Sequence, residues 1–189
     1  MHRKFLLDQL SYYTPWDERE QEMWENTLAF VRDHPTCFSR DLLEGHITGS
    51  AWIVSPCRRS VVLIHHKKLN RWFQPGGHSD NNPNTSEVAM REAMEETGLR
   101  SLKLLGKEPF DIDIHLIPEK GATPAHCHFD VRYLFEASLD ESPVVSEESN
   151  DVVWTRLEQA LIHNPERSIE RMVEKTRTAH FLARYLEAG

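Results

Sequence analysis

Residues 74–99 read QPGGHSDNNPNTSEVAMREAMEETGL, a pattern that predicts a glycine turn, a polar loop and a helix in that order. Gly76 and Gly77 permit backbone angles that other residues resist, and the proline before them fixes the start of the turn. Asn84 is a candidate N-cap for the helix, and Gly98 suits the left-handed conformation that ends one. The sequence therefore predicts both ends of this helix and a chain reversal before it.

Three carboxylates share one face of this helix, because Glu92, Glu95 and Glu96 stand at positions i, i+3 and i+4. Arg91 is placed to pair with Glu95 at i+4, but one cation does not neutralise three anions. The cluster therefore either faces water or holds a multivalent cation. Hard oxygen ligands favour Mg²⁺ or Mn²⁺ over zinc.

The spacing of these residues resembles the signature of the Nudix hydrolase family, G-x5-E-x7-R-E-U-x-E-E-x-G-U, in which U is apolar. The matching residues are Gly77, Arg91, Glu92, Ala93, Glu95, Glu96, Gly98 and Leu99. The sequence departs once, because Pro83 stands where the family has its first glutamate. By the order of the predicted elements, the resemblance extends over about residues 47–157.

The resemblance implies an α/β fold, the Nudix-type α/β/α sandwich with a mixed sheet. It also implies an enzyme, a pyrophosphohydrolase that cleaves a diphosphate bond in a nucleoside diphosphate derivative or related nucleotide. Such hydrolysis needs neutralised charge on the phosphate oxygens and an activated water, and carboxylate-held Mg²⁺ provides both. The expected cofactor is therefore Mg²⁺ or Mn²⁺, and the expected partner is a small phosphorylated substrate.

The resemblance also assigns roles to individual residues. The implied metal ligands are the carbonyl of Gly77 and the carboxylates of Glu92, Glu95 and Glu96. Arg91 is expected to orient one of these glutamates through a charge-assisted hydrogen bond. Catalysis is assigned to Glu92, Arg91 and Glu148, with the general base left open between Glu92 and the Glu147–Glu148 pair. That pair reads equally well as an exposed acidic loop.

A chain of 189 residues suffices for one well-buried core with appendages, so we expect a single domain. Its predicted parts are a helical N-terminal extension over 1–44, a Nudix core over 45–160 and a C-terminal helix over 161–189. The extension contains a helix that starts at Thr14 as N-cap and ends near residue 33. One side of this helix carries a stripe of apolar side chains, and Glu20 and Thr27 are polar residues within that stripe. The stripe is expected to dock on the core, with a homodimer contact or a substrate lid as alternatives.

Composition excludes several other classes of protein. With 22 Lys+Arg against 30 Asp+Glu, the net charge of −8 opposes tight binding to a nucleic-acid polymer. No apolar run approaches the roughly 20 residues that span a bilayer, and Asp8 interrupts the early apolar run before it forms a secretory leader. Three scattered cysteines predict neither a disulfide framework nor a thiolate zinc site. A cytoplasmic location is therefore expected.

Alternating or continuous apolar runs predict the strands, which cover residues 47–54, 60–66, 101–106, 110–116, 126–135 and 151–154. Residues 110–116 and 126–135 are expected to pair as a hairpin with one polar face. The candidate substrate-binding residues are His66 and Arg71 in a basic loop and His128 and Arg132 on the polar face. The alternative is that both groups are solvated. A separate metal site on His126, His128 and Asp130 is not expected, because alternate strand residues lie roughly 6–7 Å apart.

Two rivals to the hydrolase hypothesis come from other functional classes. The first is a Nudix-fold module that binds a nucleotide or sugar nucleotide without cleaving it, which Pro83 favours and the three glutamates oppose. The second is an isoprenoid-diphosphate isomerase, which would need a catalytic cysteine and a histidine metal site at a defined spacing.

Asp80 is a candidate for supplying the carboxylate that is missing at Pro83, if the loop folds back.

Overall fold

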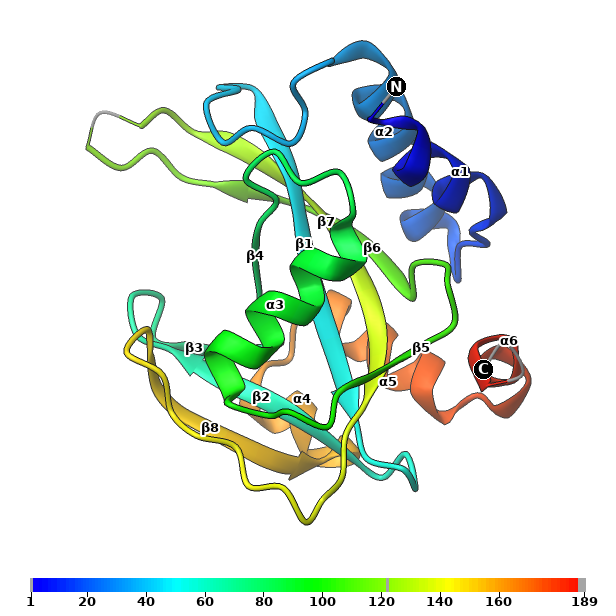
Figure 1. The fold of residues 1–189 in the computed structure, drawn as a ribbon, viewed down its shortest axis with the longest axis vertical. Helices are drawn as coiled ribbons and strands as arrows, with labels where there is room; N and C mark the ends of the chain where they lie inside the picture. The colour runs from blue at the N-terminus through cyan, green and yellow to red at the C-terminus, as the bar shows by residue number, and fades with distance from the viewer. Residues whose placement is uncertain (1, 122, 187–189) are drawn as a thin grey trace.

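The computed structural model describes residues 2–121 and 123–186. Its centre is a mixed, curled sheet with helices on both faces (Figure 1). The strands are β1 (Gly45–Val54), β2 (Ser60–His66), β3 (Arg71–Phe73), β4 (Gly76–His78), β5 (Lys103–Leu105), β6 (Asp111–Ile117), β7 (His126–Glu136) and β8 (Ser149–Arg156). Their order is β3-β2-β1-β7-β5, while β4 pairs with β1, β6 with β7 and β8 with β2. The predicted α/β fold with a mixed sheet is confirmed.

The helices differ from prediction at two places. They are α1 (Lys4–Tyr12), α2 (Glu18–Asp33), α3 (Thr85–Thr97), α4 (Ala160–His163), α5 (Arg167–Arg177) and α6 (Ala179–Leu186), with a 3₁₀ turn over Leu157–Gln159. The predicted start of α2 at Thr14 is wrong, because Asp17 is the cap and accepts a hydrogen bond from the Glu20 backbone N–H at 2.8 Å. The single C-terminal helix is also wrong, because Thr178 is extended (φ −92°, ψ 100°) and divides it. Residues 187–189 of that prediction lie outside the described residues.

Strand β1 runs through the middle of the sheet and is buried along its whole length. It pairs in parallel with β7 from Gly45↔Cys127 to Val54↔Glu136 and antiparallel with β4. The predicted hairpin of β6 and β7 is confirmed. Strands β3 and β4 are too short to show a run of alternating residues, and β4 contains Gly76 and Gly77, which the sequence predicted to form a turn.

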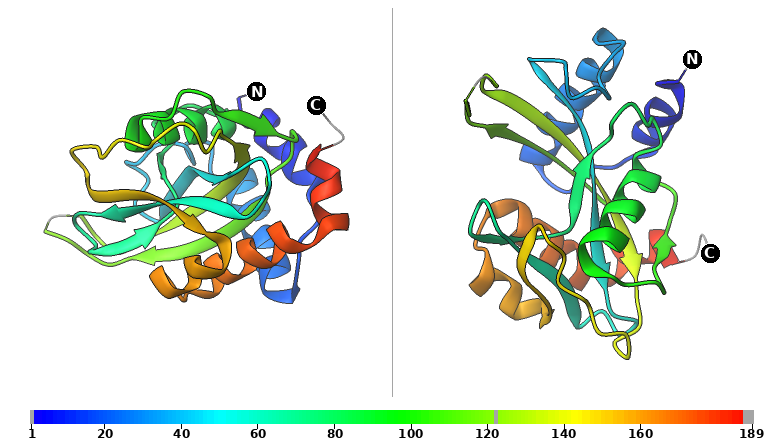
Figure 2. Two further views of the ribbon diagram at one scale, coloured as in Figure 1. Left: turned by 90° about the horizontal axis from the view of Figure 1, so that it is seen from below. Right: turned by 60° about the vertical axis from the view of Figure 1, so that its left-hand side comes forward.

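Each face of the sheet has its own apolar core. Helices α1, α2 and α3 cover the face that carries Ile47 and Tyr133, and α4 to α6 cover the face that carries Trp52. In the left view of Figure 2, α3 lies above the sheet while α4 and α5 lie below it. Helix α3 approaches β1 closely at Gly49, where an added Cβ would lie 2.6 Å from the Thr85 carbonyl oxygen. This close packing fixes α3 over the middle of the sheet.

A buried ion network joins α2, β6 and α5. The ammonium group of Lys175 lies 2.5 Å from a carboxylate oxygen of Glu20 and 2.8 Å from one of Asp111. Arg171 donates to both carboxylate oxygens of Asp111 at 2.7 Å. Glu20 and Thr27, the polar positions of the predicted stripe on α2, are both fully buried. In the described part of the chain, no helix combines the length and apolar character needed to span a membrane.

Candidate active site

The glycine turn and helix α3 contact each other directly at two positions. An added Cβ at Gly77 would lie 2.5 Å from Oε2 of Glu92, so the carboxylate occupies space that any other residue at position 77 would fill. The backbone N–H of Gly76 donates to Oε2 of Glu96 at 2.9 Å. The predicted turn at Gly76 and Gly77 is therefore wrong, because both residues lie in strand β4, but the pair does contact two of the three predicted carboxylates.

Arg91 connects the same helix to the end of β4. Its Nη2 donates to Oε1 of Glu92 at 2.6 Å and to the carbonyl of His78 at 3.1 Å. The contact predicted between Arg91 and a glutamate of the cluster is present, with Glu92 rather than Glu95 as the partner. Glu92 is thereby held in one orientation beside the turn.

The carboxylates of this site lie close enough to oppose one another's ionisation, and Arg91 pairs with Glu92. Glu96 is only 6% exposed, and burial raises its pKa to about 8, with the charges of Glu92, Glu148 and Glu95 adding to the shift. Burial also raises the pKa of Glu92, against the opposing effect of Arg91. Glu148 precedes β8, and its charge contributes to both shifts. A cation placed here would relieve this repulsion.

The donors at this site fit a hard cation. They are carboxylate oxygens, which suit Mg²⁺ or Mn²⁺. Within the described residues, Glu92, Glu95 and Glu96 do not form a group of three converging ligand atoms. Mg²⁺ usually retains several waters and takes only one or two carboxylates, so this looser arrangement suits it.

The basic loop lies beside the acidic one. His66 and Arg71 are cross-strand neighbours in β2 and β3, and the Lys67 backbone N–H donates to the Glu148 carbonyl at 3.0 Å. The His66 ring Nδ1 accepts from two backbone N–H groups of its own turn, and Arg71 pairs with Glu166 at 2.7 Å. Their predicted contact with substrate remains a prediction, with His66 the nearer to Glu148.

The prediction that Arg132 contacts substrate is wrong. Its side chain is buried, and each guanidinium nitrogen donates to a different carboxylate: Nε to Asp130 at 2.7 Å, Nη1 to Asp111 at 3.2 Å and Nη2 to Asp113 at 3.1 Å. Three anions surround it, so it completes the buried ion network. A substrate phosphate would have to displace them without solvent access.

His128 lies in a cluster of imidazoles that the sequence analysis missed. Nitrogens of His46 on β1, His78 on β4 and His128 on β7 lie within 4.8 Å of one another. Asp130 instead accepts hydrogen bonds from the hydroxyls of Thr48 and Ser50, and it is not a member of this histidine group. The register His46↔His128 is the signal that would have revealed the cluster.

Asp80 does not replace the glutamate that Pro83 displaces. Its carboxylate instead accepts two hydrogen bonds from the Arg40 guanidinium, at 2.6 and 2.7 Å. Asn84 is the N-cap residue as predicted, but its side chain makes no cap hydrogen bond and accepts from the Ser86 hydroxyl instead.

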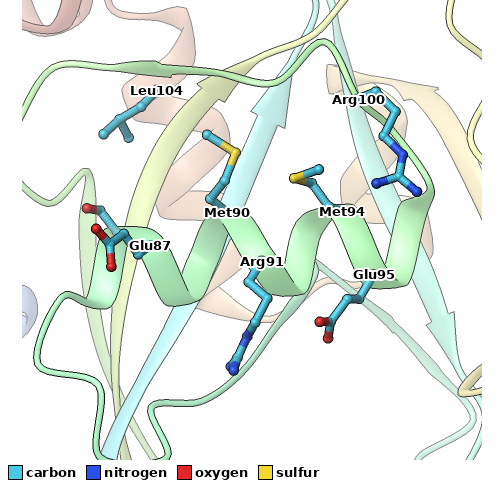
Figure 3. A pocket seen from close by; sticks show the side chains of 8 residues that line it. Glu87, Met90, Arg91, Met94, Glu95, Arg100 and Leu104 are labelled. Carbon is cyan, nitrogen blue, oxygen red and sulfur yellow. The ribbon is translucent and has the colours of Figure 1, made fainter.

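A cavity of about 480 Å³ lies on the outer side of α3 and belongs to a different surface. Its lining residues are Ser86, Glu87, Met90, Arg91, Met94, Glu95, Arg100 and Leu104. Figure 3 shows Met90 and Met94 facing it, whereas Arg91 and Glu95 extend toward the opposite side of the helix. The cavity is mainly apolar, and we assign the chemistry to the β4 side of α3.

Comparisons with known proteins point to one family. The family model described as NUDIX domain matches residues 46–175. An RNA pyrophosphohydrolase of Bartonella henselae is 41% identical over 59 residues, which are 30% of this chain and 32% of that protein, so the match spans about a third of the relative.

Solved structures agree on the fold. A NUDIX-family hydrolase from Clostridium perfringens has a TM-score of 0.52 at 25% identity and covers 69% of this chain and 95% of that one. The E. coli dihydroneopterin triphosphate pyrophosphohydrolase has a TM-score of 0.58 at 14% identity and covers 68% and 92%.

Proposed function

The chain belongs to the Nudix family, and we propose on that basis that it hydrolyses a diphosphate bond in a nucleoside diphosphate derivative or related nucleotide. The proposal includes Mg²⁺ or Mn²⁺ at the carboxylates of α3 and a small phosphorylated substrate. The observation that carries it is the packing of Glu92 and Glu96 against Gly77 and Gly76, where burial and neighbouring carboxylates raise the pKa of both glutamates. The name of the Bartonella relative, RNA pyrophosphohydrolase, supports diphosphate chemistry.

The residues of the site have different proposed roles, in metal binding and in the positioning of the metal ligands. A bound Mg²⁺ or Mn²⁺ would neutralise phosphate oxygens and lower the pKa of an attacking water. Glu92, Glu95 and Glu96 would hold it, with the Gly77 carbonyl as the further ligand. Arg91 positions Glu92, while the N–H of Gly76 positions Glu96, so both carboxylates are oriented before any ligand arrives.

We propose Glu148 as the general base, with Glu92 as the alternative. Glu148 is exposed and contributes to the pKa shifts of both Glu92 and Glu96, so its carboxylate is free to accept a proton close to the cation site. Glu92 already accepts the hydrogen bond from Arg91 at 2.6 Å, so one of its carboxylate oxygens is engaged.

A substrate screen tests the proposal. Purified protein with Mg²⁺ or Mn²⁺ is offered nucleoside triphosphates, dinucleoside polyphosphates and nucleotide sugars, and phosphate products are measured after each reaction. Turnover of at least one diphosphate is expected, and EDTA is expected to abolish it. Nucleotide binding by calorimetry without turnover of any compound would favour the binding-module rival instead.

Replacing Pro83 with glutamate tests whether the departure from the family signature matters. The three carboxylates of α3 remain in place, and position 83 lies in the loop before the helix. We expect Pro83→Glu to leave metal dependence unchanged and to shift kcat/KM by less than about 10-fold, a barrier change under about 1.4 kcal/mol. An inert wild type beside an active Pro83→Glu variant would contradict the proposal that the natural chain is an enzyme.

A further inference from the structure

The second cluster of ligand atoms lies on three strands of the sheet. His46 comes from β1, His78 from β4 and His128 from β7, and one nitrogen of each lies within 4.8 Å of the other two. The sheet fixes their backbones, because His46 pairs with His128 and Thr48 pairs with His78 in the β ladders. The convergence therefore depends on strand register and not on mobile loops.

The nitrogens of this cluster lack partners. His46 is only 3% exposed, yet neither of its ring nitrogens makes a hydrogen bond, and Nε2 of His128 is buried without one. Buried polar atoms in folded proteins nearly always have a partner, and each exception requires an explanation. These three nitrogens belong to the rings of His46 and His128, and a ligand shared between the two rings would give one nitrogen of each a partner.

The surroundings keep these rings in the form that binds metal. Burial and the neighbouring imidazoles lower the pKa of His46 to about 4, and they lower that of His128 too. Neutral imidazole is the form that ligates a metal ion.

Ligand chemistry separates this cluster from the carboxylates of α3. Imidazole suits Zn²⁺, Cu²⁺, Fe²⁺ and Ni²⁺, whereas carboxylate and water suit Mg²⁺ and Mn²⁺. Three histidines with an open fourth position form a known catalytic zinc arrangement. Zn–N bonds of about 2.0–2.1 Å bring tetrahedral nitrogens to about 3.3 Å apart, so the rings would move together slightly on binding.

We propose that His46, His78 and His128 bind one transition-metal ion of the Zn²⁺ class, at a site distinct from the carboxylate site. Strand β4 joins the two sites, since Gly76 and Gly77 contact the glutamates and the next residue is His78. Arg91 donates to the His78 carbonyl as well as to Glu92, which adds a second connection. An ion at the histidines would tie β1, β4 and β7 together behind the glycine turn.

Metal stoichiometry tests this proposal without reference to hydrolysis. Full-length protein is stripped with chelator and dialysed against Zn²⁺ or Co²⁺ in the presence of millimolar Mg²⁺, and bound metal is measured by elemental analysis. One equivalent per chain is expected, with visible d–d absorption bands for Co²⁺ and a higher Tm than in the metal-free protein. Wild type that retains no Zn²⁺ or Co²⁺ would overturn the proposal.

Matched variants locate the ion. His46→Gln and His128→Gln are each expected to weaken Zn²⁺ binding by at least about 100-fold, because loss of even an outer partner of a ligand costs 10–100-fold. His180→Gln, exposed on α6, should keep one equivalent, and so should Glu96→Gln. Circular dichroism checks that each variant is folded. Zn²⁺ retained in both folded histidine variants, or lost in Glu96→Gln alone, would place the ion elsewhere and contradict the assignment.

Discussion

Lys175→Met is expected to lower the free energy of unfolding by about 3–5 kcal/mol, because it removes one partner from a fully buried set of ion pairs. The ammonium group also donates to the Phe110 carbonyl at 2.9 Å and to the Tyr13 hydroxyl at 3.0 Å. Methionine fills similar volume and supplies no donor. The decrease in the free energy of unfolding therefore reports the buried carboxylates left without their cation, and not a cavity.

Urea unfolding monitored by tryptophan fluorescence and circular dichroism gives the measurement. Arg167→Met is the matched control on the same helix, since Arg167 is more than a third exposed and pairs with Asp17, Glu170 and Glu174. Exposed pairs contribute about 1 kcal/mol or less, so this variant should stay close to wild type. Equal losses in the two variants would contradict the assignment of stability to the buried network.

The double variant Glu20→Gln, Lys175→Met distinguishes the loss of a whole ion pair from the loss of one of its two charges. Removing both charges leaves no unpaired ion at this position, so it should be more stable than Lys175→Met alone. Glu20, Asp111 and Lys175 belong to the three predicted parts of the chain, 1–44, 45–160 and 161–189. We propose that these parts unfold as one domain, which requires both probes to report a single coincident transition.

Glu96→Gln is expected to lower turnover by about 100-fold or more, a barrier increase of about 2.7 kcal/mol, because it removes charge from a proposed metal ligand. Glutamine keeps an oxygen acceptor for the Gly76 N–H, so the contact between turn and helix is preserved. Glu87→Gln, in the first turn of the same helix and exposed, is the control and should keep wild-type turnover. Full activity in Glu96→Gln would contradict its assignment as a metal ligand.

The same variant should stabilise the metal-free protein in a pH-dependent way. Burial raises the pKa of Glu96 from 4.5 to about 8, so the folded state binds its proton more tightly than the unfolded state does. The contribution of protonated Glu96 to the stability of wild type is therefore complete below pH 4.5 and is lost as the pH rises through 8. In EDTA at pH 8.5, Glu96→Gln should have the higher Tm, whereas near pH 4.5 the two should nearly coincide. A lower Tm for the variant at pH 8.5 would refute the proposed repulsion.

The sequence by itself determined the elements whose signals are local. The ends of α3, the span of β2 and the β6–β7 hairpin follow from caps, glycines and alternation within a few residues. The carboxylates of the candidate site were equally visible, because i, i+3 and i+4 spacing on one helix fixes which side chains share a face.

Only the tertiary structure decided which polar residues are buried and what they contact. Alternation placed His128 and Arg132 together on one polar face. It did not show that Asp111 and Asp113 would enclose the arginine. Nor did it show that His46 and His78 would lie beside the histidine. Those neighbours come from strand pairings between distant segments, such as Thr48 with Asp130, 82 residues apart. Periodicity reports which face a side chain occupies, whereas its chemistry depends on the charges that the partner strands and helices bring to that face.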